Sequence, residues 1–546
     1  MTETTALSSS TLGVPGPTEL ELEPEPTDVP QARAMLERAE WAARAFRRLD
    51  KAAVDRILAA VVEAAMRHAP EYAERAVAET GFGVVEHKRL KNEACSRGVL
   101  EFYAGADFVT PRIDEAAKIV EVPRPAGVVL ALTPSTNPVA TVYFKVLLGL
   151  MTRNAVVVSP HPMAKRVCAD AARSLGAAAE AAGAPAGVVQ VVTEPTIPLI
   201  DALMTDPRTS VIVATGGNAV VRAAYRSGNP ALGVGPGNVP VLVDATADLR
   251  AAAQRIVDSK SFDNSCLCTN ESVVIVEQRV ADPFTRALRS AGAYLLDAEQ
   301  ADALRGLVFP QDRFDPRVVG RPATWLAEQA GIHVPNSTKV LVAEFEQVVP
   351  EEPLAREKLT PLLGLVRVPS AAAGIKAARA VLRISGAGHS AAVHSTDPTT
   401  ILEFGAACNV LRVSVNVGNS LGSSGIETHL APTMTVGTGY AGRSSVGENL
   451  RPDHLVNWVR LAYNADSSVP MGDFAGLSPW RASTGPVPPY PAPSNARTST
   501  RDEARPDPVP PAPRPGPAPD DGDLREELRR IIIEELHDLI GGGPRG

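Results

Sequence analysis

The sequence predicts an α/β fold with two parallel sheets covered by helices, on three observations. Short β-rich runs alternate with helical stretches between residues 118 and 240, in the order IVEVP, GVVLAL, NAVVVS, VVQVV and TSVIVAT. A second series of this kind extends from VPVLVD at 239 to RVSVN at 412–416. The chain has 546 residues, of which 45% are hydrophobic, so it can bury more than one core. Because strands that alternate with helices are joined by crossovers, both series indicate parallel pairing.

The two ends of the chain differ in composition from its centre. Residues 1–30 combine prolines with glutamates and are expected to be disordered. Residues 31–78 are rich in Ala, Leu, Arg and Glu at helical spacing, which predicts two amphipathic helices. Residues 467–519 form a Pro-rich linker, with 13 prolines between Pro486 and Pro519. Residues 520–546 have apolar side chains at helical spacing opposite charged ones, which predicts an amphipathic helix.

Charge and cysteine content narrow the class of protein. The net charge of -8 argues against a nucleic-acid binder, since no basic field is available to replace counterions on a phosphate backbone. The sequence contains no apolar run of about 18 residues and no basic segment followed by an apolar one at its start, so we expect a cytoplasmic protein without membrane contact. The five cysteines form no disulfide framework. Cys266 and Cys268 lack a second pair or matching histidines, so no metal site is expected.

The segment KSFDNSCLCTNESVVIVE at 260–277 places two thiols in a polar turn just before an apolar strand. Reactive groups of α/β proteins are displayed at such strand edges. A cysteine in this position could equally be an inert packed thiol, because free cysteines are among the most buried residues. The sequence around it decides between the two interpretations.

Seven ordered blocks within residues 31–465 resemble the acylating branch of the aldehyde dehydrogenase superfamily. This branch includes the aldehyde half of bifunctional aldehyde/alcohol dehydrogenases and the propionaldehyde and acetaldehyde dehydrogenases of bacterial microcompartments. The blocks are ETGFGVVEHKRLKN (79–92), TPSTNPVATVYFK (133–145), TRNAVVVSPHPMAK (152–165), GVGPGNVPVLVD (233–244), SFDNSCLCTNE (261–271), VVGRPATWLAEQAG (318–331) and EKLTPLLG (357–364).

The resemblance implies the aldehyde dehydrogenase architecture. A Rossmann-like cofactor-binding domain is expected over 31–240 and an α/β catalytic domain over 241–430. Residues 431–466 would return to the first domain, and strands near 116–125 and 456–464 would form an oligomerisation element. A homo-oligomer, either dimer or tetramer, is therefore expected.

The resemblance also implies three catalytic residues. The family pattern FDN-x-x-x-C places the nucleophile at Cys268, whose thiolate can form a thioester that stays reactive toward a second thiol. The family's oxyanion-binding asparagine matches Asn137, although Asn-Pro is also a turn signal. His389, in GAGHS, matches a family histidine near the active site and is a candidate general base.

The motif GVGPGN indicates which acceptor takes the acyl group. Hydrolytic members of the superfamily carry Glu-Leu-Gly-Gly here, with the glutamate as base for water, whereas this chain has Val234 at that place. Valine cannot take a proton. The thioester should then persist until the thiol of coenzyme A attacks it.

Cofactor residues are implied by three further matches. The sequence VIVATGG at 211–217 matches the strand and turn with which the family approaches the dinucleotide, through Gly216 and Gly217. Glu357 matches the carboxylate that holds the nicotinamide ribose, although a solvated surface glutamate is its alternative. The G-x-G-x-x-G at 437–442 is rejected as a Rossmann fingerprint, because no βαβ unit follows it.

The segment SPHP matches the family's adenosine ribose segment, through Ser159, His161 and Pro162. It lacks an arginine for a 2′-phosphate, which favours NAD over NADP.

The sequence therefore predicts a CoA-acylating, NAD-dependent aldehyde dehydrogenase acting on a short-chain aldehyde. Its terminal helix resembles the encapsulation peptides that recruit enzymes into bacterial microcompartments, so a shell protein is an expected partner. The alternatives are a non-acylating aldehyde dehydrogenase and a catalytically silent, shell-associated scaffold. Tyr143, Phe144 and Phe262 either line the aldehyde pocket or belong to the core.

Overall fold

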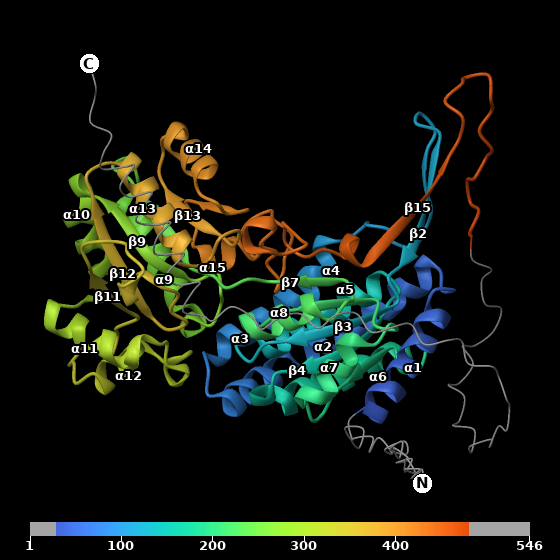
Figure 1. Ribbon diagram of the computed structural model, residues 1–546, viewed down its shortest axis with the longest axis horizontal. Coiled ribbons are helices and arrows are strands. Elements are labelled where there is room, and N and C mark those ends of the chain that lie inside the picture. The colour runs from blue at the N-terminus through green and yellow to red at the C-terminus, as the bar shows by residue number, and fades with distance from the viewer. Residues whose placement is uncertain (1–28, 480–546) are drawn as a thin grey trace, which may run out of the picture. The chain divides into compact units, whose positions relative to one another are not determined.

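The computed structural model describes residues 29–479, which belong to one compact unit of the chain (Figure 1). The segment 1–28, the linker beyond residue 479 and the predicted helix within 520–546 lie outside these residues. Within residues 29–479, no helix is both long enough and apolar enough to cross a bilayer.

Two long helices open the described chain, as the sequence predicts for residues 31–78. They are α1 (Val29–Phe46) and α2 (Lys51–Thr80), and each buries one face. The Asp50 side chain accepts a 2.8 Å hydrogen bond from the N–H of Ala53 and so caps the start of α2. Gly81, directly after the helix, is in the left-handed conformation and caps its end. The chain continues through α3 (Val85–Glu93), the π-helical turn η1 (Ala94–Gly98) and α4 (Val99–Phe102).

The first large sheet has five parallel strands in the order β5-β4-β3-β6-β7. Its strands alternate along the chain with helices, as the sequence pattern predicts. The strands are β3 (Val128–Thr133), β4 (Ala155–Pro160), β5 (Val189–Val191), β6 (Val211–Ala214) and β7 (Ala231–Gly233), and the helices are α5 (Pro138–Met151), α6 (Lys165–Ala181), α7 (Ile197–Thr205) and α8 (Asn218–Arg226).

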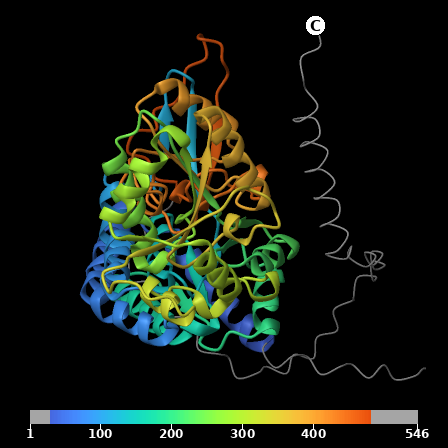
Figure 2. The same ribbon diagram turned by 90° about the vertical axis from the view of Figure 1, so that its left-hand side faces the viewer.

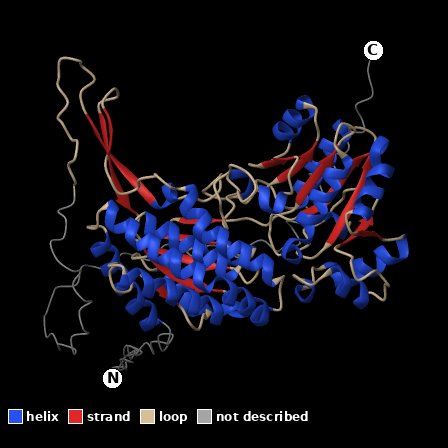
Figure 3. Ribbon diagram, turned by 180° about the vertical axis from the view of Figure 1, so that it is seen from behind, coloured by secondary structure: helices blue, strands red, loops and turns tan. Residues whose placement is uncertain are grey.

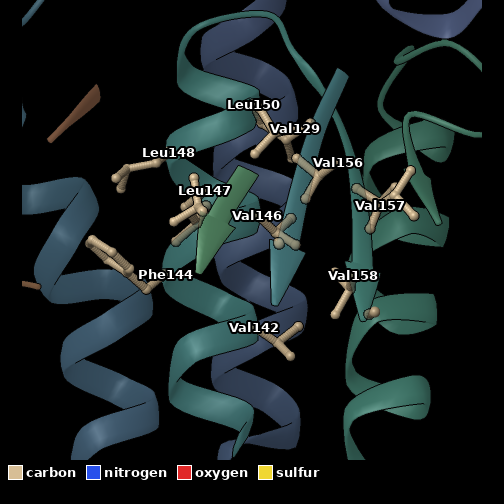
Figure 4. Packing of buried hydrophobic residues seen from close by; sticks show 14 of the residues in the cluster. Val129, Val142, Phe144, Val146, Leu147, Leu148, Leu150, Val156, Val157 and Val158 are labelled. Carbon is tan, nitrogen blue, oxygen red and sulfur yellow. The ribbon is translucent and has the colours of Figure 1, made fainter. Parts of the chain in front are cut away.

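The core of this part forms where α5 packs on the sheet. Figure 4 shows Val146 and Leu150 of α5 beside Val129 and Val156 of neighbouring strands. All fourteen residues of α5 are buried, so its sequence is largely apolar, and its one charged residue, Lys145, donates to the backbone carbonyls of Leu132 and Val213.

The run IVEVP does not belong to the parallel sheet, which corrects the prediction. It forms β2 (Ile119–Pro125), which pairs antiparallel with β1 (Arg112–Asp114) and with β15 (Val456–Ala462), as Figure 3 shows. Only two residues separate β2 from β3. A parallel neighbour needs a crossover of a dozen or more residues, so β2 cannot pair with β3 in that way.

The second large sheet has seven parallel strands in the order β10-β11-β12-β9-β8-β13-β14. Residues of β8 and β9 alternate between two cores: Val241 and Val274 face one, whereas Leu242 and Ile275 face the other. Burial on both faces explains the continuous apolar runs in these strands. Figure 2 shows helices on both sides of the sheet.

The strands of this sheet are β8 (Val239–Val243), β9 (Glu271–Glu277), β10 (Ala293–Leu295), β11 (Val340–Glu344), β12 (Leu362–Val368), β13 (Ala391–His394) and β14 (Val413–Val415). The helices are α9 (Leu249–Ser261), α10 (Gln278–Ser290), α11 (Ala298–Val308), α12 (Ala323–Gln329), α13 (Ala371–Ile384), α14 (Pro398–Ala407) and α15 (Asn419–Gly422). The short strands β7 and β10 were not expected from the sequence.

Candidate active site

A cavity of about 750 Å³ lies where the strands of the first sheet end. Its walls include Thr133 and Pro160, the last residues of β3 and β4, and also Thr215 directly after β6 and Val234 directly after β7. Ligands of open parallel sheets bind at the carboxyl ends of strands, at the point where the strand order reverses. Here β3 is flanked by β4 on one side and by β6 on the other, so the cavity occupies that point.

The loop between α9 and β9 brings the two thiols to this cavity. Its first turn, η3 (Phe262–Ser265), holds three consecutive residues in the left-handed region, at φ 50° for Asp263, 50° for Asn264 and 64° for Ser265. Asn270 then closes the loop, because its side-chain Nδ2 donates a 2.7 Å hydrogen bond to the carbonyl of Leu267. The left-handed conformations of residues 263–265 cost free energy and persist only where surrounding contacts hold them.

The two thiols of this loop differ in exposure. Cys268 is partly exposed, whereas Cys266 is 1% exposed and packs with Phe82 and Val319 in a small apolar cluster. Burial raises the pKa of both thiols to about 12. For Cys268, the carboxylate of Glu357 raises the pKa further, while the cation of Arg412 lowers it.

Asn137 lies directly before α5, whose first helical residue is Pro138. Its side chain is 8% exposed and lines the cavity. The amide Nδ2 donates a 3.2 Å hydrogen bond to the carbonyl of Cys266 and a 3.3 Å one to Oγ1 of Thr136. These long hydrogen bonds place an amide donor next to the loop that carries Cys268.

Gly237 brings a third segment against the loop. A Cβ at this position would lie 2.0 Å from the carbonyl oxygen of Cys268 and 3.3 Å from Oε1 of Glu357. No side chain larger than hydrogen fits there. Burial raises the pKa of Glu357 to about 8, although the backbone N–H of Gly237 donates to its carboxylate and lowers it.

Val234 lines the same cavity and is 4% exposed. Its backbone N–H donates a 3.2 Å hydrogen bond to the carbonyl of Ala214, which fixes the segment beside β6. The side chain at this point of the cavity wall is therefore apolar and unable to accept a proton.

A glycine-rich turn of the cavity lining is suited to a dinucleotide. Gly216 and Gly217 follow β6 and lead into α8, and a Cβ at Gly217 would meet nothing within 4 Å. No side chain of the described residues caps the first turn of α8, so its backbone N–H groups are available to an anion such as a pyrophosphate.

Ser159, His161 and Pro162, at the end of β4, also line this cavity. Burial lowers the pKa of His161, and its Nδ1 accepts a 3.2 Å hydrogen bond from the N–H of Met163. Of the nine candidate site residues, the structure thus brings together eight: Asn137, Ser159, His161, Pro162, Gly216, Gly217, Cys268 and Glu357.

His389 is the exception, since it is not among the residues that line the cavity. It is fully buried, its Nδ1 lies 3.0 Å from Oγ of Ser390, and its Nε2 has no partner within residues 29–479. Burial lowers its pKa to about 3, so the imidazole is neutral at pH 7.

The sequence allowed two positions for three aromatic residues, either in the aldehyde pocket or in the core. None of the three lines the cavity. Tyr143 and Phe144 are fully buried in the first core. Phe262 stacks on His87 with ring centroids 4.5 Å apart and borders a different cavity.

Sequence reasoning missed the charged residues behind Asn137. Lys88 and Lys91 of α3 and Asp263 of η3 are all buried and joined by ion pairs. The only signal in the sequence is the three-residue spacing of the lysines, which places both on one face of a helix.

Comparison with known proteins matches residues 22–300 to the aldehyde dehydrogenase family. An aldehyde-alcohol dehydrogenase of Streptococcus pneumoniae is 40% identical over 398 residues, which cover 71% of this chain and 45% of that protein. The chain therefore spans about half the length of this relative.

Three solved structures are similar over most of their length. An acetylating aldehyde dehydrogenase of Geobacillus thermoglucosidasius has a TM-score of 0.79 and 36% identity, over 81% of this chain and 98% of that one. A propionaldehyde dehydrogenase from the fucose utilisation microcompartment of Clostridium phytofermentans has a TM-score of 0.72 and 28% identity, over 79% and 97%. A Rhodopseudomonas palustris propionaldehyde dehydrogenase with bound CoA and an acylated cysteine has the same TM-score, identity and coverage as the Clostridium phytofermentans enzyme.

Proposed function

Because the chain belongs to the aldehyde dehydrogenase family, we propose that it is a CoA-acylating enzyme that converts a short-chain aldehyde, CoA and NAD to acyl-CoA and NADH. The observation that carries the proposal is the pairing of a partly exposed Cys268 with the apolar Val234 in one cavity. The cysteine supplies a nucleophile, and the valine leaves water without a base at that wall.

In the proposed reaction, the Cys268 thiolate adds to the aldehyde carbon and forms a C–S bond. The N–H groups of Asn137 and of the Cys268 backbone stabilise the resulting oxyanion. NAD, when bound, accepts the hydride that leaves this carbon. The Cys268 thioester then reacts with the thiolate of CoA, which forms acyl-CoA and returns the Cys268 thiolate.

The proposed cofactor residues are the lining residues that match the cofactor-binding segments of the family. Gly216 and Gly217 would admit the pyrophosphate to the N-terminus of α8, Ser159, His161 and Pro162 would flank the adenosine ribose, and Glu357 would hold the nicotinamide ribose hydroxyls. NAD is favoured over NADP for lack of an arginine in the SPHP segment.

His389 is proposed as the base for the CoA thiol from its match to the family histidine and from its Nε2, which has no partner among the described residues. In this role the imidazole has to become accessible from the cavity and its pKa has to rise from about 3. The variant His389→Ala should still form the acyl-enzyme in a single turnover but should lose CoA-dependent turnover. Loss of the single-turnover NADH signal would assign it to the first step instead.

The test of the proposed activity uses the purified full chain with two- to five-carbon aldehydes, NAD or NADP, and CoA either present or absent. NADH formation that requires CoA, with acyl-CoA identified by mass spectrometry, is the expected result. NADH and free acid without CoA would identify a non-acylating enzyme. No cofactor reduction with any aldehyde would favour the scaffold.

We also propose that the protein is a homo-oligomer packaged in a bacterial microcompartment through residues 520–546. The amphipathic pattern of that segment and the similarity to a microcompartment propionaldehyde dehydrogenase support this. Removing the residues after 485 should preserve soluble kinetics and abolish entry into the compartments of a compartment-forming host. Entry of the truncated chain would refute the role of the tail.

A further inference from the structure

Three ionisable side chains lie buried on the side of Asn137 that faces α3. Lys88 is 3% exposed, Lys91 is 1% exposed and Asp263 is fully buried. Charged groups are almost never buried unless they are paired, and these three form a single network.

Asp263 is the anchor of the network. Its Oδ1 accepts a 2.8 Å hydrogen bond from the N–H of Val84, and its Oδ2 accepts from Lys88 at 3.0 Å and also from Lys91. A Cβ at Gly83 would lie 2.1 Å from the same Oδ1, so the carboxylate packs directly against backbone. Its position is therefore held from several directions.

The two lysines differ in what else they contact. The ammonium of Lys88 donates a 3.0 Å hydrogen bond to the backbone carbonyl of Thr136. The ammonium of Lys91 donates to the side-chain Oδ1 of Asn137. Lys91 thus contacts the oxyanion donor proposed above, whereas Lys88 does not.

This contact determines which way the Asn137 amide faces. An ammonium has only donors, so the atom of Asn137 that faces Lys91 must be the oxygen. The NH₂ group then points to the opposite side, toward the loop of Cys268. A flipped amide would turn its oxygen toward the developing oxyanion, which repels it. A cation on Oδ1 also polarises the amide and strengthens its N–H donors.

We propose that Lys91, held by Asp263, is a positioning residue that keeps the Asn137 amide turned with its N–H groups toward the oxyanion. This inference rests on the proposed function of Asn137. In this proposal, the buried charges of Lys91 and Asp263 set the orientation of the uncharged Asn137 amide.

The main test compares Lys91→Met with Lys88→Met. Lys88 and Lys91 lie on the same helix, and each variant removes one ammonium group that contacts Asp263. Only Lys91→Met also removes the contact with Asn137. Lys91→Met should lower kcat about 100-fold with little change in KM, as expected for a lost oxyanion donor. Lys88→Met should lower kcat by less than about tenfold. Equal losses in kcat would overturn the proposal.

A double-mutant cycle separates orientation from a direct effect on the thiol, whose pKa the Lys91 cation also lowers. In an Asn137→Ala background, Lys91→Met should cause no further loss of kcat, because the group it acts on is gone. A full additional loss would show that Lys91 acts through Cys268 instead. Lys91→Arg, which keeps charge and donors, should recover most of the activity. Lys91→Gln carries the cycle if Lys91→Met does not fold, because its uncharged amide can present either oxygen or N–H and no longer fixes which way Asn137 faces.

A cycle of thermal stability needs no activity and therefore tests the network even if the proposed function fails. The melting-temperature losses of Lys91→Met and Asn137→Ala should be non-additive, while those of Lys88→Met and Asn137→Ala should add. Additive losses in both pairs would show that Lys91 and Asn137 do not interact, and the inference would then fail. Absence of NADH formation by the wild-type chain would instead refute the proposed function alone.

Discussion

Gly237→Ala should damage catalysis through a clash that can be worked out from the structure. The new Cβ would lie 2.0 Å from the carbonyl oxygen of Cys268, and Cβ contacts under 3.0 Å essentially never occur. The obstacle is backbone, so the Cys268 loop has to retreat by about 1 Å. A misplacement of about 1 Å costs on the order of 10²-fold in rate, or about 2.7 kcal/mol of transition-state stabilisation.

The assay measures kcat for CoA-dependent NADH formation together with the melting temperature. Gly306→Ala is the control, because its Cβ meets nothing within 4 Å and the residue lies within α11. It should keep kcat and gain roughly 0.5–1 kcal/mol of stability from the better helix former. A folded Gly237→Ala enzyme with the kcat of the wild type would show that the loop position does not limit the reaction.

Three further predictions concern the cavity itself. Cys268→Ala should abolish NAD reduction while Cys266→Ala keeps much of it, and mass spectrometry without CoA should find the acyl group on Cys268; the reverse result would move the nucleophile. Val234→Glu should release free acid without CoA, and unchanged acid release from a folded variant would contradict our placement of the missing base. Glu357→Gln removes a negative charge that helps to raise the pKa of the Cys268 thiol to about 12, so the midpoint of alkylation, which follows the thiolate and rises with pH, should move to lower pH. An unmoved midpoint would exclude electrostatic coupling of the two groups.

The sequence predicts those helices and strands whose burial produces a regular pattern of apolar residues. The long helices α1 and α2 keep one apolar face, and strands such as β8 and β9 show continuous apolar runs because both of their faces are covered. The same pattern misled for β2, whose apolar run is equally typical of an antiparallel strand. Pairing depends on the connection to β3, and apolar content alone does not reveal it.

Some residues of the candidate site could likewise be predicted from the sequence, and others could not. Cys268 and Asn137 stand in motifs that can be recognised, and the cavity brings both together. The burial of Lys91 could not be derived from the sequence, because VEHKRLKNE has the composition of a solvated helix and the lysine spacing shows only a shared helix face. Its burial arises only when Asp263, from a distant segment, arrives as its partner. Likewise, the need for glycine at 237 arises from the approach of a separate loop.

The separation of these partners along the chain has a consequence for the order of folding. The contacts of Asp263 with Val84, Lys88 and Lys91 join residues 179, 175 and 172 positions apart. Closing such long loops is entropically costly and slow, so these contacts should form late. A chain synthesised only through β7 already contains every strand of its first sheet but has neither Asp263 nor Cys268. The thiol that we propose as nucleophile therefore meets the Asn137 amide only after the segment of Asp263 and Cys268 has packed against α3, and activity should return later than helical signal during refolding.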